Sequence, residues 1–310
     1  MLRLEYGKDT LPYEKAAIAI GVFDGVHLAH RELVRTTVRE ARSMGVAAGV
    51  FTFTGSIKST SPRIYNDSEK LDILESLGID FVITASFSDI ANKSAEEFCI
   101  DVLHGELGIS LAVIGYNFKF GKGALGTSDL LKTTLNAVGA RTVIVPEMRL
   151  DGDTVSSTRV RRLVSTGDMQ TAAKLLGAPY FVSGRVEHGI GKGGTDLGFP
   201  TINVKFNRGN VRLPNGVYRA AVECRGKIYS AVCNLGECPT LAPRDVHFEA
   251  HIIDFSESIY GEEIKIYLLE YLRAETRFET VDALKMQIKV DLERVIKANG
   301  EEKWITTGQK

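Results

Sequence analysis

Two glycines and two histidines lie close together near the start of the chain. The stretch reads GVFDGVHLAH and contains Gly21, Gly25, His27 and His30. Glycine lets the backbone turn so that several N–H groups can face one ligand. Two imidazoles three residues apart lie on one face of a helical turn, where both can reach the same anion. The pattern therefore predicts a phosphate-binding loop beside an imidazole pair.

The segments on either side predict where this loop lies. An apolar run at residues 16–20 precedes it and predicts a buried strand, and residues 31–43 have the pattern of an amphipathic helix. At a strand-to-helix turn, backbone N–H groups and the positive end of the helix dipole face outward. We therefore expect residues 21–30 to bind a phosphate at the start of a helix.

Two further segments of the N-terminal half contain groups that bind phosphates. Residues 115–126, GYNFKFGKGALG, form a glycine-rich loop with Lys119 and Lys122, and residues 156–161, SSTRVR, place hydroxyl and guanidinium groups at a helix start. Taken singly, the first is also compatible with an ordinary loop and the second with a plain helix cap. A P-loop is excluded because Lys122 is followed by glycine where Ser or Thr is needed. Together with the first loop, these segments predict one nucleotide site.

The C-terminal half has a second group of candidate residues. Residues 191–203, GKGGTDLGFPTIN, combine glycines with Lys192, and such a segment can bring backbone amides against phosphates. Thr201 and Asn203 alternate along an extended segment, so both point to one side, and their oxygens suit Mg²⁺. Glu249 has mostly apolar and aromatic strand neighbours, where a carboxylate is costly without a partner or a task. The simpler alternatives are that the glycine-rich stretch is a plain surface loop and that Glu249 is an outward-facing strand residue.

The elements that position these groups differ between the two halves. Up to about residue 150, short apolar runs alternate with helical patterns, which predicts a parallel sheet with helices on both faces. The expected strands are 16–22, 47–53, 81–84, 110–115 and 141–145, and the expected helices are 31–43, 68–77, 95–106 and 127–137. Ligands of such sheets bind beyond the carboxyl ends of the strands, where two of the three candidate segments belong.

After residue 150 the pattern changes to strands separated by turns. The expected elements are helices from about 158 and over 168–176, strands at 180–188, 216–223, 227–233, 246–254 and 263–271, and a last helix at 281–298 with an apolar face of Val281, Leu284, Ile288, Leu292 and Val295. The strands predict a small antiparallel β-barrel. We therefore expect an α/β domain over residues 1–180 and a β domain with a terminal helix over residues 181–310.

The bulk composition limits the class of protein. The 310 residues are 44% hydrophobic and 25% charged, which is typical of a soluble globular enzyme, and the net charge of −1 gives no reason to expect nucleic acid or an anionic membrane as partner. No apolar run approaches the roughly 20 residues of a membrane span, and the N-terminus does not resemble a signal peptide. The four cysteines form no Cys-x-x-Cys motif, so free thiols in a reducing cytoplasm are expected ahead of a zinc site at Cys233 and Cys238.

The three segments of the N-terminal half resemble the adenylyltransferase module of prokaryotic bifunctional FAD synthetases. That module has a Rossmann-like nucleotidyltransferase fold with His-x-Gly-His and Ser-Ser-Thr-x-x-Arg signatures. The resemblance implies transfer of AMP from ATP to FMN, giving FAD and pyrophosphate, with His27 and His30 as catalytic residues that stabilise charge at the α-phosphorus. The nucleotide-binding residues that it implies are Gly21, Phe23, Asp24, Gly25, Asn117, Ser157, Thr158 and Arg161, and Asn117 is also expected near the flavin.

The C-terminal half resembles the riboflavin kinase module of the same family, through the segments LGFPTIN, NLGECPT, the Glu249 strand, Tyr260-Gly261 and LRAETRF. The resemblance implies that Thr201 and Asn203 bind Mg²⁺ with the nucleotide. It also implies that Glu249 is the catalytic base, which takes the proton from the ribityl 5′-hydroxyl as this attacks the γ-phosphorus of ATP. The further residues that it implies are Gly191, Lys192 and Gly193 for the nucleotide and Arg273 and Phe278 for the flavin.

Two features depart from the family pattern in the first module. Ala29 stands where the family has Gly between the histidines, and Thr54, Gly55 and Ser56 stand in place of a Pro-His-Pro segment. A monofunctional riboflavin kinase with a degenerate adenylyltransferase domain is therefore one alternative, and a flavin-binding regulator is another. Because both sets of motifs follow in family order over nearly the whole chain, we expect a bifunctional enzyme. It would act on riboflavin, FMN and ATP in the cytoplasm, with Mg²⁺ and without a nucleic-acid or membrane partner.

Overall fold

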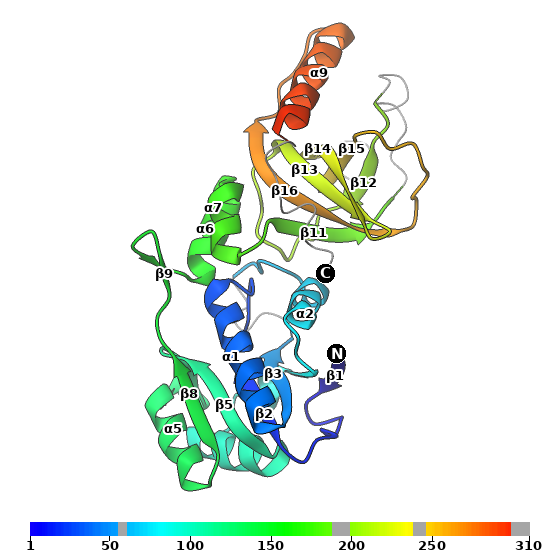
Figure 1. Ribbon diagram of the computed structural model, residues 1–310. Helices are drawn as coiled ribbons and strands as arrows, with labels where there is room; N and C mark the ends of the chain where they lie inside the picture. Colours follow the sequence, from blue (N-terminus) through cyan, green and yellow to red (C-terminus); the bar gives the residue numbers. More distant parts are fainter. Residues whose placement is uncertain (55–60, 188–198, 238–245, 299–310) are drawn as a thin grey trace. The chain divides into compact units, whose positions relative to one another are not determined.

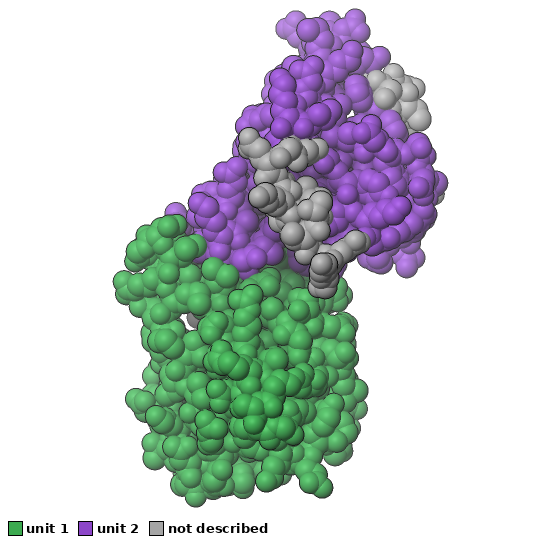
Figure 2. Space-filling model, viewed as in Figure 1, with its two compact units in different colours: residues 1–160 green, residues 161–310 purple. Residues whose placement is uncertain are grey.

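The computed structural model describes residues 1–54, 61–187, 199–237 and 246–298 (Figure 1). The chain forms two compact units, residues 1–160 and 161–310 (Figure 2). The change from one unit to the other falls within helix α6, Ser157–Thr166. The division at residue 180 that the sequence suggests stays a prediction.

A six-stranded parallel sheet forms the centre of unit 1, in the order β1–β4–β3–β2–β5–β8. Its strands are β1 Leu2–Glu5, β2 Ala16–Ile20, β3 Ala47–Phe53, β4 Phe81–Ala85, β5 Ile109–Gly115 and β8 Arg141–Val145. After β2 the chain adds β3 and β4 on one side and then returns to the other side of β2 with β5. The carboxyl ends of β2 and β5 therefore flank the point where the strand order reverses, which is where sheets of this kind bind ligands.

Helices cover this sheet, and every residue of β2 is buried, as expected for a strand packed on both faces. The described part of unit 1 contains the helices α1 Leu28–Met44, α2 Asp67–Ser76, α3 Phe87–Ile90, α4 Ala95–Glu97, η1 Phe98–Glu106 and α5 Ser128–Ala137, besides η2 Lys122–Ala124 and the start of α6. The expected helix over 95–106 is in fact a single α-turn, α4, followed by the π-helix η1. The edge strand β1 was not expected from the sequence.

Two hairpins extend from the carboxyl edge of the sheet. Strands β6, Lys119–Phe120, and β7, Gly126–Thr127, pair on either side of the short helix η2, Lys122–Ala124. Strands β9, Arg149–Leu150, and β10, Asp153–Thr154, are joined by a turn in which Asp151 and Gly152 have φ angles of 55° and 83°. This turn confirms the one expected from the Asp-Gly-Asp sequence.

Unit 2 is built on a six-stranded antiparallel sheet in the order β11–β16–β13–β14–β15–β12. Its strands are β11 Tyr180–Arg185, β12 Ile202–Lys205, β13 Gly216–Cys224, β14 Lys227–Glu237, β15 Val246–Ile252 and β16 Glu263–Arg273. A bridge between Glu187, just after β11, and Asn203 of β12 brings the two edges of the sheet together. The expected small antiparallel β-barrel is therefore confirmed.

The described part of unit 2 also contains the helices α7 Met169–Leu176 and α9 Val281–Ala298. Helix α9 has the expected bounds and packs against β14 (Figure 1). Val295 is fully buried, but Val281 is 58% exposed, so its expected place in the apolar face is wrong: it is the first residue of the helix and lies beyond the packed turns. Asp291, which the apolar pattern did not include, is buried.

Across the ranges that the structure describes, every helix is too short or too polar to cross a membrane.

Candidate functional sites

The loop between β2 and α1 has an unusual backbone. Phe23, Gly25 and Val26 have φ angles of 54°, 82° and 39°. Glycine adopts such values freely, but in an aromatic or β-branched residue they store strain. Phe23 and Val26 are fully buried, so packing holds them in this conformation. Strain of this kind, at the carboxyl end of a central strand, points to a ligand-binding loop.

Asp24 connects this loop to two segments that are distant in the sequence. The backbone N–H of Ile64 donates a hydrogen bond to the Asp24 carboxylate at 3.0 Å, and the Ser157 hydroxyl donates to the Asp24 carbonyl at 2.8 Å. Gly25 next to it leaves no space for a larger residue, because an added Cβ would lie 2.7 Å from Cδ1 of Ile64. Two of the three predicted phosphate-binding segments are thus in direct contact.

His27 and His30 stack against each other at the start of α1. Their ring centroids are 3.8 Å apart with an angle of 14° between the planes, and the Phe23 ring lies 5.2 Å from the His30 ring. The Nδ1 atom of His30 is buried and has no hydrogen-bond partner among the residues that the structure describes. Burial, with a smaller contribution from His27, holds the pKa of His30 well below its usual value. His30 is therefore neutral at neutral pH.

The two serines at the start of α6 form different hydrogen bonds. The Ser156 hydroxyl accepts a hydrogen bond from the backbone N–H of Arg159 at 3.3 Å, so Ser156 caps the helix. Ser157 is the first helical residue, and its hydroxyl binds the Asp24 loop instead. Thr158 is exposed, and Arg161 lies four residues after Ser157 in the same helix, within unit 2.

The glycine-rich loop follows β5, the strand beside β2. The Ser128 hydroxyl lies 2.9 Å from the Gly115 carbonyl and 3.1 Å from the Tyr116 carbonyl, and Phe118 donates its backbone N–H to Gly115 at 3.1 Å. These bonds fix the turn in which Asn117 lies exposed. Because β5 and β2 are parallel neighbours, this loop and the loop containing Gly21 belong to the same edge of the sheet.

The replaced Pro-His-Pro segment begins at the end of β3. The buried Lys70 of α2 donates a hydrogen bond to the Phe53 carbonyl at 2.6 Å, and the backbone N–H of Thr54 donates to Ala85 at 3.1 Å. These contacts show how the strand ends. Gly55 and Ser56, the other two residues that stand in place of this segment, lie outside the described residues.

Glu249 lies in one row with two asparagines on neighbouring strands of unit 2. On β15 it is directly opposite Asn203 of β12 and Asn234 of β14. Residues directly opposite in an antiparallel pair share one face of the sheet. Thr201 comes two residues before Asn203, so the predicted metal ligands and the predicted base lie together. The predicted nucleotide contacts Gly191, Lys192 and Gly193 lie outside the described residues.

Glu275 is a second carboxylate near Glu249, and it was not among the residues predicted from the sequence. The side-chain amides of Asn215 and Asn234 each donate a hydrogen bond to it at 3.4 Å. It lies against Gly236, where there is no space for a Cβ atom. The only signal in the sequence was its place within the LRAETRF segment that carried the resemblance.

The surroundings of Glu249 change its acidity. Partial removal from water raises the pKa of Glu249, His247 opposes this rise, and Glu275 adds to it. A carboxylate whose pKa is raised accepts a proton more readily, provided that it is ionised when the reaction begins. Glu249 therefore has the environment of a general base.

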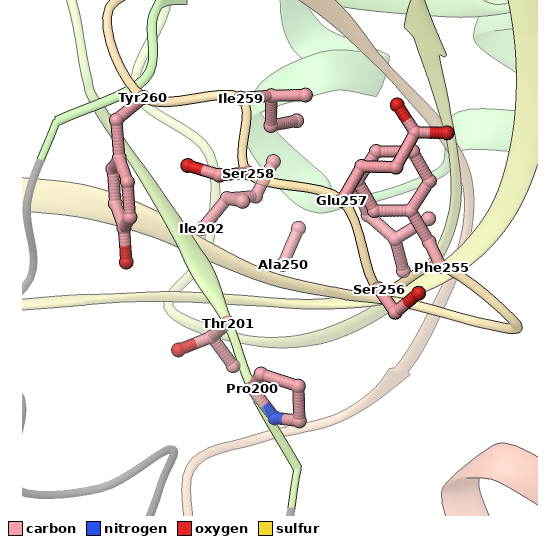
Figure 3. A pocket seen from close by; sticks show the side chains of 11 residues that line it. Pro200, Thr201, Ile202, Ala250, Phe255, Ser256, Glu257, Ser258, Ile259 and Tyr260 are labelled. Atoms are coloured by element: carbon pink, nitrogen blue, oxygen red, sulfur yellow. The ribbon is translucent and has the colours of Figure 1, made fainter.

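A small pocket opens beside Thr201 (Figure 3). One wall is the strand segment that contains Pro200, Thr201 and Ile202, and the facing wall is the loop that contains Ser258 and Tyr260. Nδ1 of His251 lies 2.8 Å from the Pro200 carbonyl and fixes the start of this strand segment. The pocket thus combines apolar walls with hydroxyl groups, and Thr201 is the predicted metal ligand that lines it.

Arg273 and Phe278, the predicted flavin contacts, lie together at the end of β16. The guanidinium carbon of Arg273 is 5.9 Å from the centre of the Phe278 ring. Arg273 also forms a bidentate ion pair with Asp291 of α9, with 2.8 Å between Nη2 and Oδ2. Asp291 was not predicted from the sequence, although its spacing from Leu284, Ile288 and Val295 places it on the packed face of the helix.

The described cysteines are buried free thiols, Cys99, Cys224 and Cys233. Burial raises the pKa of Cys99 to about 12, so this thiol is unreactive. Within the described ranges, His, Cys, Asp and Glu form no group of three that could hold a metal ion. Cys238, the second residue of the alternative zinc site, lies outside those ranges.

Comparison with known proteins gives a match in each half of the chain. Residues 10–159 match the family model of FAD synthetase, and residues 176–298 match that of riboflavin kinase. The bifunctional riboflavin kinase/FMN adenylyltransferase of Bacillus subtilis is 32% identical over 91% of this chain and 92% of its own length. Proteins of the same name from Haemophilus influenzae and Escherichia coli K12 are each 34% identical, over 89% and 90% of this chain and 92% and 91% of their own lengths.

The fold is also similar to a known crystal structure, that of a macrolide-efflux protein from Streptococcus pneumoniae. The TM-score is 0.84 with 29% sequence identity, and the match covers 96% of this chain and 99% of the other. The arrangement of both halves along the chain is therefore shared with a protein of known structure.

Proposed function

Because the chain belongs to the family of bifunctional riboflavin kinases/FMN adenylyltransferases, we propose that its two activities occupy two separate sites, one in each unit. The enzyme phosphorylates riboflavin to FMN and then transfers AMP to FMN, giving FAD and pyrophosphate. The presence of both family domains, and of relatives that match over about nine-tenths of the chain, favours this function over a monofunctional kinase. Riboflavin and FMN are therefore its flavin substrates.

The adenylyl-transfer site is proposed at the carboxyl edge of the parallel sheet. The observation that supports it is the contact between the strained loop around Asp24 and Ser157 at the start of α6. Backbone N–H groups of the loop, with Gly21, Phe23 and Gly25, would hold the triphosphate of ATP at the N-terminus of α1. Thr158 and Arg161 would bind the phosphates that leave as pyrophosphate, and Asn117 would contact the nucleotide and the flavin.

Positioning and charge stabilisation are the chemistry proposed at this site. The terminal phosphate oxygen of FMN attacks the α-phosphorus of ATP, and the bond to pyrophosphate breaks. His27 and His30 would donate hydrogen bonds to the α-phosphate, where negative charge develops. Since His30 is half-buried and neutral, a bound triphosphate would favour its protonated form and so strengthen this interaction.

The kinase site is proposed around Glu249, on the face of the barrel that contains Asn203 and Asn234. Glu249 would take the proton from the ribityl 5′-hydroxyl while the oxygen attacks the γ-phosphorus of ATP and ADP leaves. Partial removal from water, with a smaller contribution from Glu275, raises the pKa of Glu249 and so increases its basicity. Arg273 and Phe278 would hold the flavin ring.

Mg²⁺ and ATP are part of the proposal. The hydroxyl of Thr201 and the amide oxygen of Asn203 are hard ligands that fit Mg²⁺ together with phosphate oxygens. When bound, the ion would neutralise charge on the transferred phosphoryl group. The pocket beside Thr201, with Ile202 and Tyr260 in its walls, would take the nucleoside part of ATP (Figure 3). Gly191, Lys192 and Gly193 would contact its phosphates.

A cytoplasmic location is also proposed. It is supported by the three buried thiols that remain unpaired in the described structure and by substrates that are small soluble molecules. The near-zero net charge gives no support for a nucleic-acid or membrane partner.

Chromatography of the products from riboflavin and ATP tests the proposed chemistry. We expect FMN to appear first and FAD to follow when Mg²⁺ is present, and neither to form when EDTA removes the metal. The same mixture started from FMN should give FAD directly. FMN without any FAD, or full activity in EDTA, would contradict the proposal.

A further inference from the structure

Asp291 is a buried carboxylate on the packed face of α9. It is 5% exposed and lies one helical turn from Val295, which is fully buried. A carboxylate in such a place is costly unless it is paired and hydrogen-bonded. Its partners therefore indicate why the chain retains an acidic residue at this position.

The two oxygens of Asp291 bind the guanidinium group of Arg273 as a fork. Nη2 of Arg273 lies 2.8 Å from Oδ2, and Nε lies 3.2 Å from Oδ1 and 3.1 Å from Oδ2. Gln287, one turn earlier in α9, donates a further hydrogen bond to Oδ1 at 3.0 Å. A bidentate pair of this kind fixes the plane of the guanidinium group as well as its position.

The third nitrogen of Arg273 is also engaged, since Nη1 donates to the Ala274 carbonyl at 3.2 Å. Each nitrogen of the group thus already has an acceptor within the protein. A ligand can still stack on the flat face of the guanidinium without breaking any of these bonds. The Phe278 ring lies beside the guanidinium group of Arg273, with its centre 5.9 Å from the guanidinium carbon.

We propose that Asp291 is a positioning residue of the riboflavin kinase site, which holds the guanidinium plane of Arg273 so that the isoalloxazine ring stacks on it. The inference rests on the proposed function, in which Arg273 contacts the flavin. Arg273 would then recognise the flavin by its π-face and not by hydrogen bonds to the ring carbonyls. Asp291 itself touches no substrate.

The attachment of α9 to the barrel does not by itself require this ion pair. Val295 packs against the barrel, and Arg294 of the same helix forms an ion pair with Glu270 of β16. An apolar pair of similar size would hold a helix at least as well as a buried ion pair, because it avoids the cost of removing two charges from water. What the ion pair adds is a fixed orientation of one planar cation.

Steady-state kinetics of Asp291→Asn in the full-length chain test the inference. Asparagine has almost the same shape but loses the charged fork, so the KM for riboflavin should rise about tenfold while kcat stays within about twofold. Asp282→Asn is the matched control, because Asp282 is an exposed acid on the same helix, and it should change neither constant. Conversion of FMN to FAD should be normal in both variants.

Arg273→Lys separates this inference from the proposed function. It keeps the charge but removes the plane, and its KM for riboflavin should rise as in Asp291→Asn. An unchanged KM in Arg273→Lys would overturn the flavin role of Arg273 itself. A raised KM in Arg273→Lys with an unchanged KM in Asp291→Asn would overturn only the role of Asp291.

A purely structural role of Asp291 gives a different result. Asp291→Asn would then have a lower free energy of unfolding in urea, while its KM for riboflavin would stay as in the wild type. This result would overturn the inference. If Asp291→Asn does not fold, Asp291→Glu replaces it. The longer side chain keeps the carboxylate but displaces the fork, so the KM should rise with kcat retained, and an unchanged KM would again overturn the inference.

Discussion

At the scale of single residues, the chemistry depends on groups whose surroundings change their acidity. His30 stacks on His27 and lies beside the tilted ring of Phe23, and Glu249 lies near Glu275. Partial removal from water favours the neutral form of both side chains, so it lowers the pKa of His30 and raises that of Glu249. In the proposed function, a bound phosphate would favour protonation of His30, and Glu249 would accept a proton from the substrate.

The lowered pKa of His30 leads to a pH-dependent stability of the enzyme. Below the ordinary histidine value of about 6.5, the unfolded chain binds a proton at His30 that the folded chain does not bind. The free energy of unfolding should therefore fall with decreasing pH, by about 1 kcal/mol from this residue between pH 6.5 and pH 5.5.

Urea unfolding of the wild type and of His30→Gln at several pH values measures this contribution. The variant should lose less stability on acidification than the wild type. The same pH dependence in both proteins would mean that His30 is protonated in the folded enzyme as easily as in the unfolded chain.

At the scale of the elements, much of the fold could be predicted from apolar periodicity. The bounds of β3, β8 and α9 are as expected. The two strands are short runs of mainly apolar residues, and the helix has apolar residues at helical spacing along its whole length. The π-helix η1 and the edge strand β1 could not be predicted, since both depend on tertiary packing.

In the candidate sites, too, residues within local motifs could be predicted from the sequence, and their tertiary contacts could not. The sequence placed His27, His30, Ser157 and Glu249 in candidate sites, because their motifs are local. It could not reveal that Ser157 binds the Asp24 carbonyl or that Asp291 binds Arg273. Those contacts join segments that are far apart in the chain, and the spacing of apolar residues does not predict them.

The two serines at the start of α6 predict two different effects. Ser156→Ala removes the helix cap and should lower the free energy of unfolding by about 1 kcal/mol, with little effect on either activity of the folded enzyme. Ser157→Ala removes the hydrogen bond to the Asp24 loop and should weaken FMN-to-FAD conversion more than stability.

Assays of the two reactions and urea unfolding of both variants check this pair. Each variant is the control for the other, since both lose one hydroxyl from adjacent positions. Equal losses of adenylyl transfer in the two variants would show that Ser157 acts only through the helix.

At the scale of the whole molecule, the chain joins two folds that are used for different chemistry. A parallel sheet with helices presents loops at one edge, which suits the binding of a triphosphate. An antiparallel barrel places side chains of neighbouring strands opposite one another, which suits a base beside metal ligands. Each unit therefore has its own candidate site, and Arg161 is the one predicted residue of the first site that falls within unit 2.

Separate assay of the two reactions in two variants tests this account most directly. Glu249→Gln should lower riboflavin-to-FMN conversion by roughly 10²- to 10⁴-fold, the usual contribution of a general base, and leave FMN-to-FAD conversion unchanged. The double variant His27→Ala, His30→Ala should lose FMN-to-FAD conversion and keep the kinase activity. Loss of both activities together in either variant, with the protein still folded, would contradict the assignment of one site to each unit.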